Sequence, residues 1–248
     1  SYCGIFGIYG NSTASVQAYY GLHALQHRGQ EASGIVTRSF NGDSRAHFNI
    51  VKGEGLVSEV FADHNLLNDV LIGNAAIGHN RYSTTGSAKS RKNIQPFMVN
   101  YRMGNLAIGH NGNLTNAKEL REELVNEGAI FQTTSDTEVI LHLIARSKLN
   151  NQIDQILEAL RRIEGAYCVV ILTDDKLIAA RDPLGFRPLA LGKLDNSFLI
   201  ASETCAFDIQ HAEFLREIEQ GHLVLSDDES ISKDENKSFR INGNHQQK

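Results

Sequence analysis

The chain has 248 residues, of which 41% are hydrophobic and 21% charged, as in an ordinary soluble globular protein of one large or two small domains. Its net charge of −5 and the shortness of its one basic cluster argue against nucleic-acid binding. No apolar run approaches the ~20 residues of a membrane helix, and no basic segment followed by an apolar stretch opens the chain, so we expect neither a membrane segment nor a secretory signal.

The three cysteines, Cys3, Cys168 and Cys205, are odd in number and far apart, which does not indicate a disulfide framework. The sequence has no Cys-x-x-Cys pair and no His-Glu-x-x-His segment, so we expect no metal site in this chain. Unpaired cysteines are typical of a reducing compartment, and we therefore expect a cytoplasmic protein.

The first elements in chain order are strands with one helix between them. Short apolar runs punctuated by glycine predict strands, and the polar residues 11–13 can begin a helix. The expected elements are a strand at 3–9, a helix at about 14–26, a turn at 27–30, a strand at 33–37 and a hairpin at 40–50 around Asn41-Gly42.

The tetrapeptide Ile-Gly-His-Asn occurs twice, at residues 77–80 and at residues 108–111. Each copy follows an apolar run of small residues, so we expect two buried strands that end at the same edge of one sheet. The two Asn side chains would then face a common cleft.

Helices and further strands follow in blocks. Ser135 stands three residues before Glu138, which is the capping-box spacing at the start of a helix. The polar tail 226–248 predicts a final hairpin or a linker. Because helices and strands do not alternate strictly, we expect an α+β layered fold. The expected helices cover about 116–127, 135–144 and 153–163, and the expected strands 167–173, 177–180, 189–191 and 198–201.

Cys3 stands at the head of the first expected strand, where a cysteine is more often a small buried hydrophobe. Its place near the chain start allows a second interpretation. A free α-amino group has a pKa of roughly 7.7–8.0 and can act as the general base for a thiol nucleophile without a histidine.

A thiolate that attacks an amide needs hydrogen-bond donors for the oxygen that gains charge. Asn111 offers a side-chain amide and Gly112 a backbone N–H, although an Asn-Gly pair alone more often marks a tight turn. Arg81 could bind a substrate carboxylate or form a surface ion pair. Asp136 could pair with a substrate ammonium or simply start a helix.

Two loops carry less information. The segment 181–189 contains two of the three prolines, and we interpret it as a rigid structural corner rather than a catalytic loop. The segment 52–55 lacks the third glycine and the strand-to-helix context of a phosphate loop, so we discard that hypothesis.

Five short motifs occur in a fixed order: Cys-Gly-Ile-Phe-Gly-Ile at 3–8, His-Arg-Gly at 27–29, Gly-His-Asn-Arg-Tyr-Ser-Thr at 78–84, His-Asn-Gly-Asn-Leu at 110–114 and Ser-Asp-Thr-Glu at 135–138. Together they resemble the class-II glutamine amidotransferase domain, which belongs to the N-terminal-nucleophile hydrolases. The resemblance covers residue 3 to about residue 225. It implies a four-layer αββα sandwich.

Within that class, the segments 25–35, 81–86, 181–189 and 201–208 resemble the amidophosphoribosyltransferases. The sugar-phosphate aminotransferases tend to have Tyr-Arg-Gly-Tyr-Asp and Arg-Trp-Ala-Thr in the first two places. The resemblance implies hydrolysis of glutamine to glutamate and ammonia through a cysteine thioester. The ammonia would pass to phosphoribosyl pyrophosphate and give 5-phosphoribosylamine, in the first step of de novo purine synthesis.

The resemblance also implies a role for each matching residue. It implies no cofactor in this domain, with magnesium expected only in a phosphoribosyltransferase domain, and a homo-oligomer for the full-length enzyme. The implied roles are Cys3 as the nucleophile, Arg81 and Asp136 as the holders of the α-carboxylate and α-ammonium of glutamine, Asn111 and Gly112 as the oxyanion hole, and Arg28 and Gly29 as the lining near the substrate amide.

Two features depart from the family pattern. The family nucleophile is the first residue of the mature chain, whereas Ser1 and Tyr2 precede Cys3 here, so that the nitrogen of Cys3 is an amide. These two residues are interpreted as a leader that is removed, as additions to the natural chain, or as the mark of an inactive form. We interpret the chain as a fragment without the phosphoribosyltransferase domain. We expect residues 3–225 to be the glutamine amidotransferase domain and 226–248 a terminal hairpin or a linker to that second domain.

Two other hypotheses stay open. The same fold could serve another acceptor, such as a sugar phosphate or an aspartyl adenylate, although the segment 26–31 opposes this. Alternatively, the chain could be an inactive module that binds glutamine or a partner protein, for which the blocked nitrogen of Cys3 is the only support.

Overall fold

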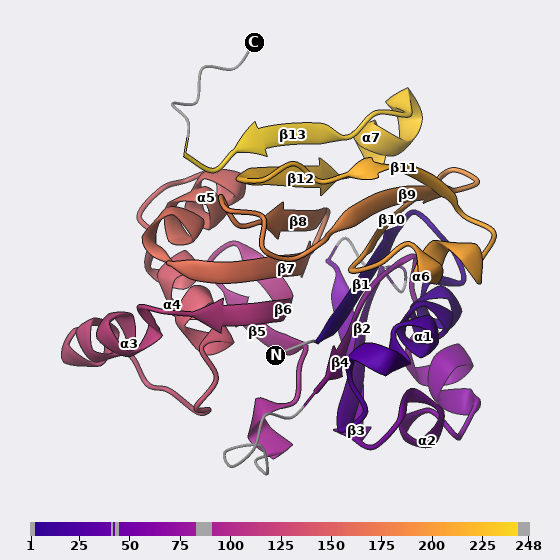
Figure 1. Ribbon diagram of the computed structural model, residues 1–248, viewed down its shortest axis with the longest axis horizontal. Coiled ribbons are helices and arrows are strands. Elements are labelled where there is room, and N and C mark those ends of the chain that lie inside the picture. Colours follow the sequence, from indigo (N-terminus) through magenta and orange to yellow (C-terminus); the bar gives the residue numbers. More distant parts are fainter. Residues whose placement is uncertain (1–2, 41, 43–44, 83–90, 243–248) are drawn as a thin grey trace.

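The computed structural model describes residues 3–40, 42, 45–82 and 91–242, and arranges them in four layers (Figure 1). Two antiparallel sheets pack face to face, and helices cover the outer face of each sheet. The expected α+β, four-layer αββα sandwich is therefore confirmed.

Seven strands form the first sheet, in the order β11-β9-β10-β1-β4-β2-β3. The chain thus starts in the middle of this sheet, with β1 between β10 and β4. The expected hairpin at 40–50 is present, since Ser39 of β2 pairs with His47 of β3, although residues 41, 43 and 44 of its loop lie outside the described residues. The strands are β1 Gly4–Tyr9, β2 Ala32–Ser39, β3 His47–Glu54, β4 Ala75–Arg81, β9 Ala190–Leu194, β10 Ser197–Ala201 and β11 Glu213–Glu217.

Six strands form the second sheet, in the order β13-β12-β8-β7-β6-β5, and the long strand β6 lies between β5 and β7. The strands are β5 Phe97–Tyr101, β6 Gly104–Leu114, β7 Gly165–Thr173, β8 Leu177–Arg181, β12 His222–Ser226 and β13 Lys237–Arg240.

The helices divide between the two outer layers. Those that pack on the first sheet are α1 Ala14–Ala24, α2 Val57–Val60, the π-helical η2 Leu66–Val70 and α6 Cys205–Asp208; those on the second are α3 Ala117–Asn126, α4 Thr137–Arg146 and α5 Gln152–Arg162. Two 3-10 turns, η1 Gln26–Arg28 and η3 Arg91–Asn93, and the short α7 Asp228–Lys233 complete the set. Among the described residues, no helix has the length and apolar character that a membrane crossing needs.

Alternation along β1 shows how the layers are joined. Phe6 and Ile8 point to the helices of the first layer, whereas Ile5 and Tyr9 point to the second sheet. Gly7 lies on that inner face, where a Cβ would come within 2.9 Å of Val170. The run 4–9 is apolar throughout because both of its faces are buried.

The repeated Ile-Gly-His-Asn segments do not end at one sheet edge, so that prediction was wrong. Residues 77–80 belong to β4 of the first sheet and residues 108–111 to β6 of the second. Their faces are also opposite: Asn80 bonds the carbonyl of Leu22 in α1, whereas Asn111 shares the inner face with Ala107. An identical sequence segment predicts a buried strand in both places, but it does not predict which sheet each strand joins.

The capping box expected at Ser135 was also wrong. The N-cap residue of α4 is Asp136, not Ser135. Glu138 instead accepts hydrogen bonds from the backbone N–H groups of Gln132 and Thr133, each at 2.8 Å. The spacing matched because Glu138 does bind backbone donors, but these belong to the preceding loop.

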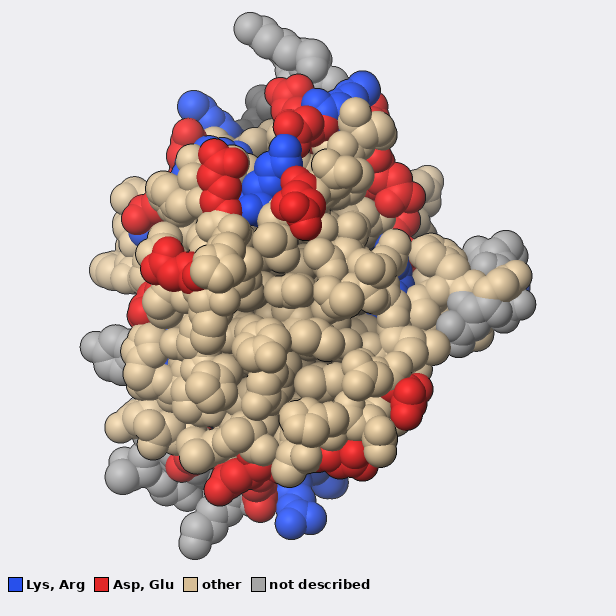
Figure 2. All heavy atoms as spheres, turned by 90° about the vertical axis from the view of Figure 1, so that its right-hand side faces the viewer, with Lys and Arg blue, Asp and Glu red and all other residues tan. Residues whose placement is uncertain are grey.

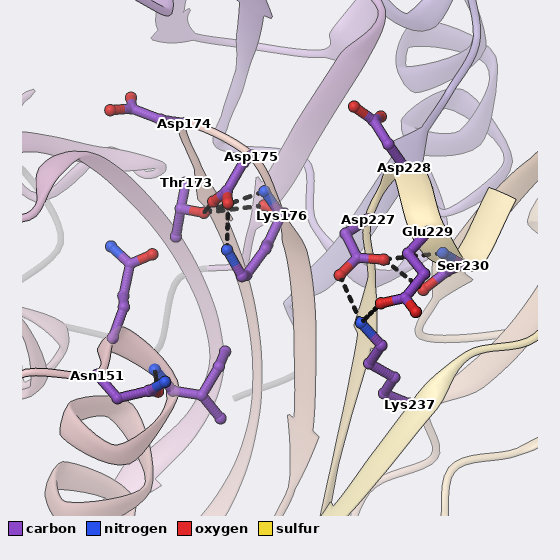
Figure 3. Close-up of polar contacts among 12 residues, drawn as sticks. Asn151, Thr173, Asp174, Asp175, Lys176, Asp227, Asp228, Glu229, Ser230 and Lys237 are labelled. Atoms are coloured by element: carbon purple, nitrogen blue, oxygen red, sulfur yellow. Dashed lines mark hydrogen bonds and ion pairs between the residues drawn. The ribbon is translucent and has the colours of Figure 1, made fainter. Parts of the chain in front are cut away.

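The segment from 226 onwards contains α7 and β13, and β13 pairs antiparallel with β12 as the edge strand of the second sheet. Asp227 caps α7 by accepting from the N–H of Ser230 at 2.8 Å, and Lys237 pairs with Asp227 and Glu229 (Figure 3). These bonds attach the connection to the sheet. The domain boundary expected at residue 225 stays a prediction.

The outer face of the first helix layer carries few charges. Figure 2 shows charged side chains along the upper and lower margins of this side of the molecule, with a broad uncharged area between them. Helix α1 contributes to this character, since its sequence contains no Lys, Arg, Asp or Glu.

Candidate active site

Cys3 lies immediately before β1 and is 7% exposed. Its carbonyl oxygen accepts a hydrogen bond from Nε of Arg28 at 3.0 Å. In the register of β1 with β4, Gly4 pairs with Asn80, and Cys3 and Arg81 are the next residues along the two chains from this pair. The expected nucleophile and the expected carboxylate-binding arginine therefore each adjoin this paired position.

Gly29 follows the 3-10 turn η1 and packs against the backbone of Arg81. A Cβ at Gly29 would come within 2.6 Å of the carbonyl carbon of Arg81, so only glycine allows this approach. The N–H of Glu31 also bonds the carbonyl oxygen of Arg81 at 3.1 Å. The structure thus brings four of the expected site residues together, with Arg28 and Gly29 beside Cys3 and Arg81.

Asn111 and Gly112 lie inside β6, where they pair with Cys168 and Tyr167 of β7. The tight turn that the Asn-Gly pair favours on local sequence was wrong, because the β6–β7 ladder continues through it. Gly112 is required for packing, since a Cβ there would come within 2.1 Å of the carbonyl oxygen of Ala166.

The side chain of Asn111 is fully buried on the inner face of β6, between the two sheets. Neither its Oδ1 nor its Nδ2 has a hydrogen-bond partner among the described residues. A buried amide without partners typically costs about 1–3 kcal/mol, so such groups are rare unless a ligand uses them. Asn111 thus presents a donor and an acceptor to the space between the sheets.

The inner faces of β1 and β6 meet near this amide. A Cβ at Gly109, two residues before Asn111 on the same face, would lie 3.7 Å from Cγ2 of Ile5. Ile5 follows Cys3 by two residues in the extended chain. The amide, which has no partner among the described residues, thus lies on β6, and the cysteine directly precedes β1, the strand that faces β6 across the sheets.

Asp136 begins α4 and reaches back to the end of β6. Its Oδ2 accepts from the N–H of Leu114 at 3.0 Å, and its Oδ1 lies 3.5 Å from Nδ1 of His110. Burial alone would raise the pKa of Asp136, but His110 and the backbone N–H groups of Leu114 and Thr137 outweigh it and hold the pKa below its ordinary value. The interpretation as a helix-start residue is correct, and ammonium binding would use the remaining lone pairs.

A histidine pair that the sequence did not single out links the two groups of residues. Nε2 of His79 on β4 lies 3.1 Å from the carbonyl oxygen of His110 on β6. His110 in turn contacts Asp136. The repeated Ile-Gly-His-Asn letters were the available signal, but they were interpreted as neighbouring strand ends rather than as facing strands.

The loop 181–189 is a hydrogen-bonded corner, in agreement with its sequence interpretation. Asp182 is fully buried and accepts from the N–H groups of Leu184 and Tyr167 at 3.0 and 3.3 Å. The guanidinium of Arg181 donates to the carbonyl oxygens of Gly185 and Ile218. These contacts bind the loop to β7 and to the end of β11.

None of the three cysteines forms a disulfide bond. Cys168 is fully buried, and burial raises the pKa of its thiol to about 12, which leaves almost no thiolate at neutral pH. Burial and the neighbouring Glu203 also raise the pKa of Cys205. These shifts disfavour the reactive thiolate form of Cys168 and Cys205.

The family comparison agrees with this arrangement. A family model described as a glutamine amidotransferase domain matches residues 79–208, just over half of the chain. The chain belongs to the glutamine amidotransferase domain family.

Two curated relatives of this chain are amidophosphoribosyltransferases. Amidophosphoribosyltransferase 2, chloroplastic, of Arabidopsis thaliana is 49% identical over 92% of this chain and 40% of its own length. The amidophosphoribosyltransferase of Bacillus subtilis (strain 168) is 46% identical over 97% of this chain and 49% of its own length. The chain thus spans about half the length of the curated relatives that it matches.

A solved structure described as the allosteric regulatory enzyme of purine biosynthesis has the same fold, with a TM-score of 0.89 at 44% identity. The match covers 98% of this chain and 50% of the other. The N-terminal-nucleophile sandwich expected for this glutamine amidotransferase domain is thereby confirmed.

Proposed function

We propose that this chain is the glutaminase part of an amidophosphoribosyltransferase. The thiol of Cys3 attacks the side-chain amide carbon of glutamine, and the C–N bond breaks to release ammonia and leave a glutamyl thioester. Water then hydrolyses the thioester, which releases glutamate and restores the thiol. The observation that carries this proposal is the buried amide of Asn111, which has no hydrogen-bond partner within the described part of the chain and lies on the strand that faces β1, just after Cys3. Such a donor, held in place before the substrate arrives, suits an oxygen that gains negative charge during attack.

The other residues have matching roles. Nδ2 of Asn111 and the N–H of Gly112 form the oxyanion hole. Arg81 binds the α-carboxylate and Asp136 the α-ammonium of glutamine, supported by the anionic state that a lowered pKa gives Asp136. Arg28 and Gly29 line the site near the substrate amide, as their contacts with Cys3 and Arg81 support.

The base for this reaction is the amino group of Cys3 itself. In the peptide bond with Tyr2 that nitrogen has no basic lone pair, so the reaction requires cleavage of the bond between Tyr2 and Cys3. Once released, the amine has a pKa of roughly 7.7–8.0 and can take the thiol proton near neutral pH.

The acceptor of the ammonia is phosphoribosyl pyrophosphate, which gives 5-phosphoribosylamine. The names of the relatives and their identity of 46–49% support this choice over a sugar phosphate or an aspartyl adenylate. The transfer belongs to a full-length protein in which a phosphoribosyltransferase domain, with its magnesium, is the partner. We further propose that this full-length protein is a homo-oligomer. We also propose a cytoplasmic location, which the three free cysteines support.

The test measures glutamate release from glutamine by protein that begins at Cys3, beside the same protein with Cys3→Ala. The proposal expects turnover in the first protein and none in the second. Equal turnover in both, or none in a folded protein that begins at Cys3, would reject the glutaminase assignment. In a full-length form, pyrophosphate release that depends on both substrates tests the acceptor separately.

A further inference from the structure

We propose that Glu203 is a positioning residue, which holds the guanidinium of Arg28 against the carbonyl oxygen of Cys3 and so fixes the backbone of the nucleophile. The inference rests on the proposed function, because it assigns a role within the same site. Neither the sequence motifs nor the roles proposed above assign a function to Glu203.

The backbone around Glu203 is attached to β1 close to Cys3. The preceding residue, Ser202, is fully buried, and its Oγ accepts from the N–H of Ile5 at 3.0 Å. Its own N–H donates to the carbonyl oxygen of Ile5 at 3.1 Å. The segment after β10 is therefore bound to the first strand two residues from the cysteine.

The side chain of Glu203 completes a second connection to the same place. Oε1 accepts from Nη1 of Arg28, and Nε of that arginine donates to the carbonyl oxygen of Cys3 at 3.0 Å. Oε2 lies 2.8 Å from Nε2 of His27. Arg28 thus bridges the carboxylate and the residue that carries the nucleophile.

The position of Arg28 depends on Glu203 because the positive charge of its guanidinium is buried. The side chain of Arg28 is only 7% exposed, and a buried guanidinium is costly unless a carboxylate and further acceptors balance it. Burial alone would raise the pKa of Glu203, but the bonds from Arg28 and His27 outweigh it and lower the pKa, so the carboxylate is ionised at neutral pH.

A metal site is the competing interpretation of this cluster. The ligand atoms of His27, Glu203 and Cys205 all lie within 4.8 Å of one another. However, the carboxylate already bonds Arg28 through one oxygen and His27 through the other. A dication here would lie beside the guanidinium and would have to displace these partners, so we assign the cluster to positioning.

The nucleophile of an acyl transfer must lie within a fraction of an ångström of its productive place, and a misplacement of about 1 Å can cost on the order of 10²-fold in rate. The amide plane that follows Cys3 sets the direction of its side chain. Loss of the carboxylate frees Arg28, and the cysteine then loses one of the bonds that hold this plane.

The experiment compares the wild type with Glu203→Gln in two assays, with Glu123→Gln as the matched control. Glu123 pairs with Arg162 at 2.7 Å on the surface, so its variant removes the same type of ion pair elsewhere. In protein that begins at Cys3, Glu203→Gln should lower kcat for glutamate release by roughly 10- to 100-fold. KM should change less than about twofold, and Glu123→Gln should behave as wild type.

The second assay follows alkylation of each cysteine of the full chain by iodoacetamide, mapped by mass spectrometry. In Glu203→Gln, the positive charge of Arg28 loses its counter-ion and favours the thiolate, so Cys3 should react several-fold faster. Cys168 should stay unreactive in every variant, because it is fully buried. General loosening of the fold would instead expose both cysteines together.

The two assays separate the inference from the proposed function. Unchanged kcat and unchanged Cys3 alkylation in Glu203→Gln would overturn the positioning role. Faster alkylation of Cys168 alongside Cys3 would also overturn it, because it would show a structural role only. If the wild type releases no glutamate, the glutaminase assignment fails, while the alkylation rates still decide the role of Glu203. Loss of wild-type activity after dialysis against EDTA would favour the metal instead.

Discussion

Asn111 is the residue at which folding and the proposed chemistry conflict. Its amide is buried between two sheets without partners among the described residues, which lowers the stability of the fold. A donor aimed at the oxyanion has this character, because it is held in place before the substrate arrives. Replacement of a functional residue of this kind commonly raises the free energy of unfolding of the protein.

We therefore predict that Asn111→Ala lowers kcat for glutamine hydrolysis by about 10²–10³-fold. Its free energy of unfolding should stay equal or rise, because an unpaired buried amide is removed. Steady-state kinetics and urea denaturation measure the two effects. Asn100→Ala, on the exposed side of β5, is the control and should change neither. A kcat within twofold of wild type would exclude Asn111 from the oxyanion hole.

Sequence motifs name candidate site residues, whose catalytic roles stay predictions, but they do not name the residues that surround them. Cys3, Arg81, Asn111 and Asp136 follow from short motifs whose residue types suit the chemistry. Glu203 and the pair His79–His110 were missed because their roles depend on contacts between strands far apart in sequence. Nothing in the local pattern of such residues states which strand they will face.

At the scale of elements, long periodic segments were predicted well, because burial repeats along them. Helix α5 was expected at 153–163 and occupies Gln152–Arg162, and its first turn is capped by Asn151. The edge strands β5 and β11 were missed. β11 presents most of its residues to water, and therefore lacks the apolar run by which a buried strand is found.

Helix α4 is attached to β6 through Asp136, and this contact should depend on pH. The pKa of Asp136 is lower in the folded chain than its ordinary value near 3.8. The unfolded chain therefore takes up the proton first as the pH falls. The stability from this carboxylate is full above about pH 3.8 and is lost as the pH falls through the lower folded pKa.

We predict that Asp136→Asn lowers the free energy of unfolding by about 1.5–3 kcal/mol at pH 7, since hydrogen bonds to a charged group are lost. The difference from wild type should disappear in acid, below the folded pKa. Urea denaturation across a pH series tests this, with Glu119→Gln in the exposed first turn of α3 as the control. A difference that stays constant down to the lowest pH would show that the charge is not responsible.

At the scale of the whole molecule, one buried arginine joins the two sheets. Arg38 of β2 is 1% exposed and donates to the hydroxyl of Tyr9 on β1 and to the carbonyl oxygen of Asp174, both at 3.1 Å. Asp174 belongs to the turn between β7 and β8 of the second sheet (Figure 3). Burial raises the pKa of Tyr9 to about 12, so its hydroxyl stays protonated and donates onward to Asp228.

Arg38→Met should lower the free energy of unfolding by about 1.5–3 kcal/mol or more, because several bonds to a charged group are lost together. The kinetic constants for glutamine should stay within about twofold, since none of the proposed site residues contacts this cluster. Arg45→Met, at an exposed position of the β2–β3 loop, is the control. Unchanged stability would mean that apolar packing between the sheets suffices without the arginine.

We propose that Cys3 is the nucleophile once its amino group is free. Intact mass and N-terminal sequencing after incubation with the glutamine analogue 6-diazo-5-oxo-norleucine test it most directly. We predict that protein beginning at Cys3 gains one adduct, located at Cys3, and that glutamine protects against it. A folded protein that begins at Cys3 and stays unmodified, or is modified at Cys205 instead, would contradict the claim.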